Sequence, residues 1–174
     1  IRDLLTYSRV SSTPPEMADV SLPSLLTDVR NDLDLVIREK GATLRVDPLP
    51  AVVGDTLQLR QLFQNLLSNA LKFSRPEVTP VVEVRHRPVM GAETEAMLLL
   101  QPDTLYHEIS VSDNGIGFDE QYADRIFEAF QRLHGRAAYP GTGIGLAIVK
   151  KVVENHRGGL SVNSRVGEGS TFRV

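Results

Sequence analysis

Residues 55–73 carry the pattern that most restricts how this chain can fold. Apolar side chains recur there every three or four residues, which predicts a helix with one face on a core. Asp55 is a capping residue at its start, and Pro76 marks its end. The apolar stripe consists of Leu59, Leu62, Phe63, Leu66, Leu67, Ala70 and Leu71.

The rest of the chain predicts further helices and a set of strands. Ser21 caps a helix that runs to Lys40, a third helix spans 145–156, and a short helix is expected over 122–130. Strands are predicted at 17–20, 43–46, 81–87, within 98–112, 160–163 and 170–174. We therefore expect an α+β fold, a two-layer α/β sandwich in which one mixed or antiparallel sheet is covered on one face by three helices.

Residues 1–12 are set apart from this pattern by Pro14 and Pro15. Two successive prolines cannot continue a helix, so the segment is predicted to be the end of a helix followed by a stiff linker. A helix this short is not stable alone. Because the chain begins at Ile1 rather than Met, we expect the helix to find its partners in a preceding part of a longer protein.

Composition excludes several classes of function. The chain has no cysteine, which rules out disulfides and thiolate metal sites and is in keeping with a reducing, cytoplasmic compartment. The net charge of −3 gives no basic footprint for a nucleic acid. The longest apolar run, 96–100, is far shorter than the ~20 residues of a membrane span, so no direct membrane contact is expected.

Three polar residues follow one line along the helix predicted over 55–73. Asn65, Asn69 and Lys72 are spaced at i, i+4 and i+7, and they border the apolar stripe rather than oppose it. At the rim of a core, two amides offer neutral oxygens to a hard cation and the ammonium offers a positive charge to phosphate. The alternative is that all three are solvated residues of an ordinary amphipathic helix.

Three glycine-rich loops follow. Residues 113–118 come after a strand, 141–146 open a helix, and 167–172 join two strands. Backbone N–H groups at a helix start, with no side chains in the way, suit an anionic phosphate. The P-loop and dinucleotide fingerprints are both absent, the latter because Leu146 stands where glycine is needed. Each loop on its own is also compatible with a simple tight turn.

Asp113 opens the first of these loops. A carboxylate in an apolar pocket can accept a hydrogen bond from an exocyclic amine, and Ile116, Ile126 and Leu146 are candidate walls for such a pocket. The alternatives are an Asx-turn for Asp113 and plain core for the three apolar residues.

Taken together, these segments resemble the conserved boxes of sensor histidine kinases, in the order and with the spacing of that family. Residues 65–74 resemble the N box, 113–118 the G1 box, 126–130 the F box, 141–146 the G2 box and 167–172 the last glycine box. The resemblance covers residues 15–174 and implies the Bergerat fold of the related ATPases and kinases. Residues 130–141 look most like phytochrome-type kinases.

The resemblance implies a role for each residue in binding Mg²⁺ and ATP. Asn69, helped by Asn65, would ligate Mg²⁺ between the phosphates, Lys72 would contact phosphate, and Arg132 would contact the γ-phosphate. Asp113 would receive the adenine amino group, with Thr171 assisting through water. Residues 119–140 would form a mobile lid. The remaining implied ATP-binding residues are Gly115, Ile116, Gly117, Gly141, Thr142, Gly143, Gly145 and Leu146.

The resemblance also implies the domain organisation and partners. Residues 1–13 would be the end of the dimerisation and histidine-phosphotransfer helix with its linker, and 14–174 the catalytic ATP-binding domain. The implied partners are the phosphotransfer domain of the parent kinase, expected to be a homodimer, and a response regulator receiver domain.

None of the four histidines fits a phosphoacceptor motif. Related hydrolases carry Glu where this chain has Asn65, and an amide cannot accept a proton at neutral pH. We therefore expect a protein-histidine kinase whose acceptor histidine is not in this chain. The alternatives are an ATP hydrolase or serine kinase of the same fold, or a non-enzymatic docking module.

Overall fold

The structure is a computed structural model that describes residues 2–94, 100–133, 139 and 141–174. The helices are α1 (Arg2–Ser12), α2 (Leu22–Asp32), α3 (Asp34–Glu39), α4 (Thr56–Lys72) and α5 (Gly145–Asn155). The strands are β1 (Ala18–Ser21), β2 (Thr43–Val46), β3 (Ala51–Gly54), β4 (Val81–Met90), β5 (Leu105–Asp113), β6 (Ser161–Arg165) and β7 (Gly169–Arg173). Single 3₁₀ turns are η1 (Gly91–Glu93), η2 (Glu120–Tyr122) and η3 (Arg125–Phe127).

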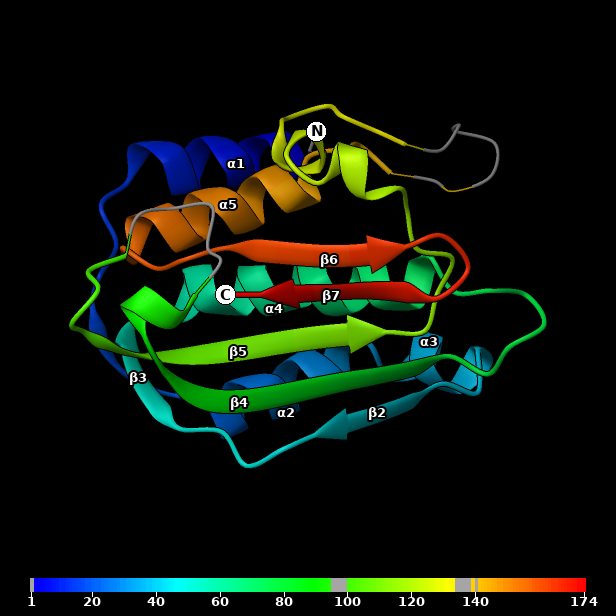
Figure 1. The fold of residues 1–174 in the computed structure, drawn as a ribbon, viewed down its shortest axis with the longest axis horizontal. Helices are drawn as coiled ribbons and strands as arrows, with labels where there is room; N and C mark the ends of the chain where they lie inside the picture. Colours follow the sequence, from blue (N-terminus) through cyan, green and yellow to red (C-terminus); the bar gives the residue numbers. More distant parts are fainter. Residues whose placement is uncertain (1, 95–99, 134–138, 140) are drawn as a thin grey trace.

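One mixed sheet organises the domain. Its strand order is β2-β4-β5-β7-β6, in which β2 and β4 are parallel and every other pair is antiparallel. Helices α2, α4 and α5 lie together on one face of this sheet (Figure 1). The predicted α+β sandwich, with a mixed sheet covered on one face by three helices, is confirmed. No described helix is both long and apolar enough to cross a membrane.

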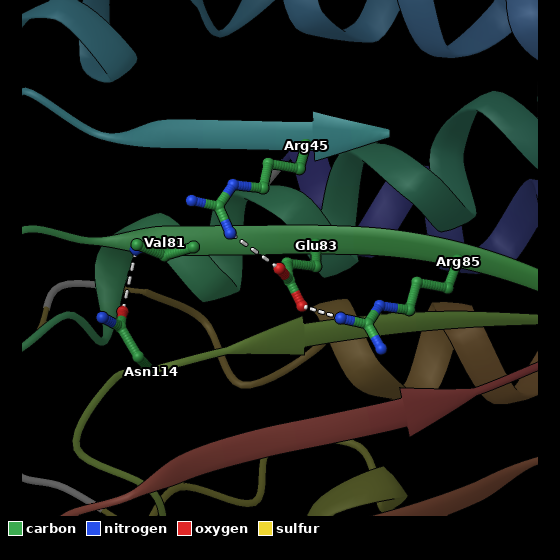
Figure 2. A network of polar contacts seen from close by, with 5 residues as sticks. All are labelled: Arg45, Val81, Glu83, Arg85 and Asn114. Carbon is green, nitrogen blue, oxygen red and sulfur yellow. Dashed lines mark hydrogen bonds and ion pairs between the residues drawn. The ribbon is translucent and has the colours of Figure 1, made fainter. Parts of the chain in front are cut away.

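The two faces of the sheet differ in chemistry because side chains alternate along each strand. The covered face buries Val82, Val84, Val111 and Phe172 against the helices. The open face is polar, and Figure 2 shows part of it: Glu83 accepts from Arg45 at 3.1 Å and from Arg85 at 2.7 Å.

Helix α4 begins and ends where the sequence predicts. The Asp55 carboxylate accepts the Gln58 amide at 3.0 Å and caps the helix, while its second oxygen accepts the Glu16 amide at 2.9 Å. The Asp55 amide in turn donates to His156 Nε2 at 2.9 Å, which joins the start of α4 to the end of α5. These bonds set the position of α4 along the sheet, and so the position of its polar stripe.

Two local predictions were wrong, and one strand was missed. The helix expected from Ser21 to Lys40 is divided into α2 and α3 at Leu33, whose ψ is 0°. The helix expected over 122–130 is absent from these described residues, which form η2 and η3 and then turn at Phe130, whose φ is +67°. Strand β3 was not predicted, and it pairs antiparallel with β1 in a separate ribbon.

Helix α1 has partners within the chain, and the further partners expected in a preceding part of a longer protein stay a prediction. Val10 is 7% exposed in the core, and Tyr7 packs against the same cluster. The Asn155 amide of α5 donates to the Val10 carbonyl and to the Gln58 side chain, both at 2.9 Å. The short helix is therefore stabilised by docking on α5 rather than by its own propensity.

This docking predicts that Val10→Ala loosens α1. Loss of two buried methyl groups costs about 1–2 kcal/mol, so amide hydrogen exchange in residues 5–12 should become about five- to thirtyfold faster. The control is Leu5→Ala on the same helix, since Leu5 is 56% exposed and its truncation should change exchange little. Equal acceleration by both variants would show that α1 is not held through Val10.

Candidate nucleotide-binding site

A cavity of about 490 Å³ opens between α4, the loop that follows β5, and the start of α5. It is lined by most of the residues that the sequence singles out. Those on its lining are Asn65, Asn69, Lys72, Asp113, Ile116, Gly117, Arg132, Gly141, Thr142, Gly143, Gly145 and Leu146. Among the described residues that were singled out, Gly115 and Thr171 lie outside the lining.

The polar stripe of α4 forms one wall. Asn65 donates from Nδ2 to the Gln61 carbonyl at 2.9 Å, which orients its amide. A Cβ added at Gly145 would lie 3.1 Å from Asn65 Oδ1, so this oxygen faces the start of α5 at close range. Asn69 and Lys72 line the cavity farther along the same helix. The three side chains therefore share one rim, as their spacing predicts.

The Lys72 ammonium lies close to a second cation, the guanidinium of Arg132. Its Nζ is 4.6 Å from the centroid of the Phe73 ring, and a Cβ at Gly141 would approach Nζ to 2.6 Å. Burial, and then the charge of Arg132, lower the pKa of Lys72, while the Asp3 carboxylate acts in the opposite direction. Two cations close together at one end of a cavity are suited to an anionic ligand.

Asp113 stands on the opposite wall, at the last residue of β5. Its Oδ1 accepts the Gly115 amide at 2.8 Å, and the Ser170 amide also donates to the carboxylate. Burial raises the pKa of Asp113 from 3.8 to about 6, although these two backbone hydrogen bonds act in the opposite direction. The Asx-turn alternative is thus correct locally, and the same carboxylate also lines the cavity.

Gly115 serves the cavity indirectly, by letting the loop lie against the end of α4. A Cβ there would come within 2.4 Å of the Phe73 carbonyl oxygen. That oxygen accepts the Ile116 amide at 2.9 Å. Gly117 has a φ of +59° and approaches the Arg165 carbonyl just as closely. In both cases the neighbour that requires glycine is the chain itself rather than a ligand.

Arg75 and Asn114 hold this loop in place, and the sequence did not single out either residue. The Arg75 guanidinium donates to the Asn114 carbonyl at 2.9 Å and to the Gly167 carbonyl at 2.8 Å. The Asn114 side chain accepts the Val81 amide at 2.8 Å, as Figure 2 shows. These bonds connect the end of α4 to the first and third glycine loops.

Ser170 occupies the position that the sequence assigned to Thr171. Asp113 pairs with Ser170 and Ser112 with Thr171 in the register of β5 and β7, so the two members of each pair share a face. Ser170 is buried and lines the cavity, whereas Thr171 shares a 2.9 Å hydroxyl hydrogen bond with Ser112 on the open face. The assignment to Thr171 is therefore corrected by one residue, and strand alternation applied to residues 169–173 would have found Ser170.

The second glycine loop and Arg132 form the outer part of the cavity. Arg132 donates to the carbonyls of Tyr139, at 2.7 Å, and of Gly141. The ring of Tyr139 packs on Phe73 at a centroid distance of 5.1 Å. Part of the predicted lid over 119–140, namely residues 134–138 and 140, lies outside the described residues, and the mobility of the lid stays a prediction.

The donor set fits magnesium better than a softer metal. Asn65 and Asn69 contribute amide oxygens, which are ligands for a hard cation, and Mg²⁺ usually keeps waters and takes phosphate oxygens as further ligands. No group of three or more His, Cys, Asp or Glu residues gathers at a metal-binding distance among the described residues. A metal at this rim would therefore depend on a phosphate ligand for negative charge.

The raised pKa of Asp113 predicts how stability depends on pH. An acid whose pKa is higher in the folded state stabilises the fold below its unfolded pKa, and that contribution is lost as pH rises through the folded pKa. The free energy of unfolding of Asp113→Asn, measured relative to wild type, should therefore be about 1–3 kcal/mol higher at pH 8 than at pH 4. Most of this change should occur between pH 4 and 6. Urea unfolding across this range measures it, and exposed Asp103→Asn is the control. A difference between Asp113→Asn and wild type that does not vary with pH would contradict the shift.

Comparison with known proteins identifies the family of the chain. Residues 54–174 match the model of the histidine kinase-, DNA gyrase B-, and HSP90-like ATPase family. The chain is 45% identical over 172 residues to cyanobacterial phytochrome A of Nostoc sp., covering 99% of this chain and 20% of that protein. It is 40% identical over 181 residues to the sensor histidine kinase AruS of Pseudomonas aeruginosa, covering 99% and 17%. The chain thus spans about a fifth of the length of these relatives.

Solved structures show the same fold. Full-length ShkA in complex with AMPPNP has a TM-score of 0.76 and 28% identity, covering 99% of this chain and 34% of that chain. The mycobacterial sensor histidine kinase MprB has a TM-score of 0.65 and 29% identity, covering 91% and 94%. With its sheet, its cavity and the match over residues 54–174, the chain belongs to the family of histidine kinase-, DNA gyrase B- and HSP90-like ATPases.

Proposed function

We propose that this chain is the catalytic domain of a sensor histidine kinase, which binds Mg·ATP and transfers the γ-phosphoryl group to a histidine of a phosphotransfer domain. One observation carries the proposal: Asn65, Asn69 and Lys72 face the same cavity as Asp113 and the 141–146 loop. The cavity thus has an acceptor at one wall and cations with peptide N–H groups at the other. That is the polarity required by a nucleotide, whose base carries an amino group and whose other end carries phosphates.

Asp113 and Ser170 would recognise the base. The carboxylate accepts a hydrogen bond from the adenine amino group, and the Ser170 hydroxyl lies on the same face to complete the contact, directly or through water. Ile116, Ile126 and Leu146 line the cavity and would pack on the faces of the ring. Guanine presents an oxygen where adenine presents its amino group, so a carboxylate here disfavours guanine.

Lys72, Arg132 and the loop from Gly141 to Gly145 would hold the phosphates. Arg132 has to exchange the Tyr139 and Gly141 carbonyls for phosphate oxygens, which is favourable because its planar donors match a phosphate bidentately. Asn69, helped by Asn65, would hold Mg²⁺. When bound, the ion neutralises charge that develops on the phosphate oxygens.

Transfer is favoured over hydrolysis because the described wall of α4 carries an amide at position 65, where related hydrolases carry Glu as the base. Asn65 is an amide, so it cannot take a proton from water. In the transfer, an imidazole nitrogen forms a bond to the γ-phosphorus, the bond to the β–γ bridging oxygen breaks, and ADP leaves with the electron pair. Keeping water inactive preserves the γ-phosphate until this nucleophile arrives.

The acceptor would come from another domain. Among the described residues no histidine lines the cavity: His86 and His107 bond each other at 2.9 Å, and His156 is held by Asp55 and Val152. We infer that residues 1–13 end the dimerisation and phosphotransfer helix and that 14–174 form the catalytic domain. The phosphotransfer domain, a response regulator receiver domain and a homodimeric parent with this domain in the cytoplasm complete the proposal.

The test is phosphorylation in trans. The chain is incubated with radiolabelled Mg·ATP and with an isolated dimerisation and phosphotransfer domain of a related kinase. We expect label in an acid-labile, base-stable phosphohistidine and little free phosphate without the acceptor. Rapid Mg-dependent phosphate release without the acceptor would favour the hydrolase, and the absence of nucleotide binding would favour a docking module.

Asn69→Ala tests the metal assignment. Without its amide oxygen, transfer in the presence of Mg²⁺ should fall about tenfold or more, while ATP affinity measured in EDTA should stay within about twofold of wild type. Calorimetry gives the affinity and the trans assay gives the rate. The control is Gln121→Ala, which removes a similar amide from the exposed turn η2. Equal losses with and without metal would contradict a metal-binding role for Asn69.

A further inference from the structure

Asp3 brings a carboxylate to the end of the cavity where the cations gather. It lies in the first turn of α1, lines the cavity, and accepts a 2.6 Å hydrogen bond from the Thr142 hydroxyl. The sequence reasoning assigned Asp3 no role. In Figure 1 the start of α1 lies beside the segment between β5 and α5, in agreement with this contact.

The charges around Asp3 are those that a phosphate would use. Thr142 belongs to the glycine loop at the start of α5, and Lys72 is close enough for the Asp3 carboxylate to favour its charged form. Asp3 and Asp113 are the acids on the described lining, and Asp113 is engaged by Gly115 and Ser170 at the other wall. Asp3 would therefore compete with a bound phosphate for the hydrogen-bond donors at the cationic end of the cavity.

Asp3 is exposed, whereas Asp113 is partly buried, so Asp3 marks the rim of the cavity. A nucleotide whose base sits against Asp113 extends toward this rim, and its outermost phosphate comes closest to Asp3. Repulsion between the carboxylate and that phosphate weakens binding of the longer nucleotide more than of the shorter one.

We propose that Asp3 is a specificity-determining residue of the nucleotide site, which lowers affinity for a nucleoside triphosphate relative to the diphosphate. This inference rests on the proposed function. Asp3 lies seven positions before Val10, the buried anchor of α1. The first turn of the helix can therefore leave Thr142 when a triphosphate binds, while the later turns stay docked on α5.

Asp3→Asn tests the proposal, because it removes the charge and keeps the shape and an acceptor oxygen. Calorimetry measures the affinities of wild type and variant for ATP, ADP and adenosine, first in EDTA and then with Mg²⁺. We expect ATP in EDTA to bind about three- to tenfold tighter to the variant, ADP less than twofold tighter, and adenosine unchanged. The gain should shrink at high ionic strength, since Asp3 is exposed.

Asp103→Asn is the matched control, since it makes the same change of charge just before β5, at the opposite end of the strand from Asp113. Equal tightening of ATP by both variants would attribute the effect to net charge and overturn the proposal, as would unchanged ATP binding by Asp3→Asn. Weaker Mg·ATP binding by Asp3→Asn would make the carboxylate a metal ligand instead, which also overturns it. Failure of wild type to bind any of the three ligands would contradict the proposed function itself.

Discussion

The hydrogen bond between the Ile116 amide and the Phe73 carbonyl is the constraint on which the site depends. It joins the loop after β5 to the end of α4, and Gly115 is required for that close approach. As a result, the strand that ends in Asp113 and the helix that ends in Lys72 meet at one end of the sheet. Arg75 strengthens the same junction by bonding the carbonyls of Asn114 and Gly167. Without this junction the acceptor and the cations would not share a cavity.

Much of this arrangement could be predicted from the sequence, because the spacing of apolar and polar residues indicates which side chains share one face of a helix. The stripe of Asn65, Asn69 and Lys72 requires only a regular helix, and α4 is regular. The error at Thr171 arose because a motif gives the order of residues but not which face of a strand each one occupies. Asp3 could not be found at all, since its contact with Thr142 spans nearly the whole chain. The expected helix over 122–130 failed because local periodicity does not reveal the turn at Phe130.

The chemistry of the site depends on what its walls lack as well as on what they hold. On α4 the polar residues that line the cavity are two amides, the Ser68 hydroxyl and an ammonium, with no carboxylate or imidazole among them, so this wall can orient and neutralise phosphates without supplying a base for water. Asp113 supplies a carboxylate at a place where burial is partial and two peptide N–H groups support the charge. A domain built in this way binds its nucleotide and leaves the choice of nucleophile to whatever protein docks on it.

The place of β7 in the sheet has a consequence for biosynthesis. It is the last of the five strands in chain order, yet it lies in the interior between β5 and β6. A nascent chain on the ribosome therefore exposes an open edge of β5 until residues 169–173 have emerged, and open edges invite intermolecular pairing. Ser170 arrives on that same strand, so cellular ATP can stabilise the domain through a complete pocket only after this strand has been translated.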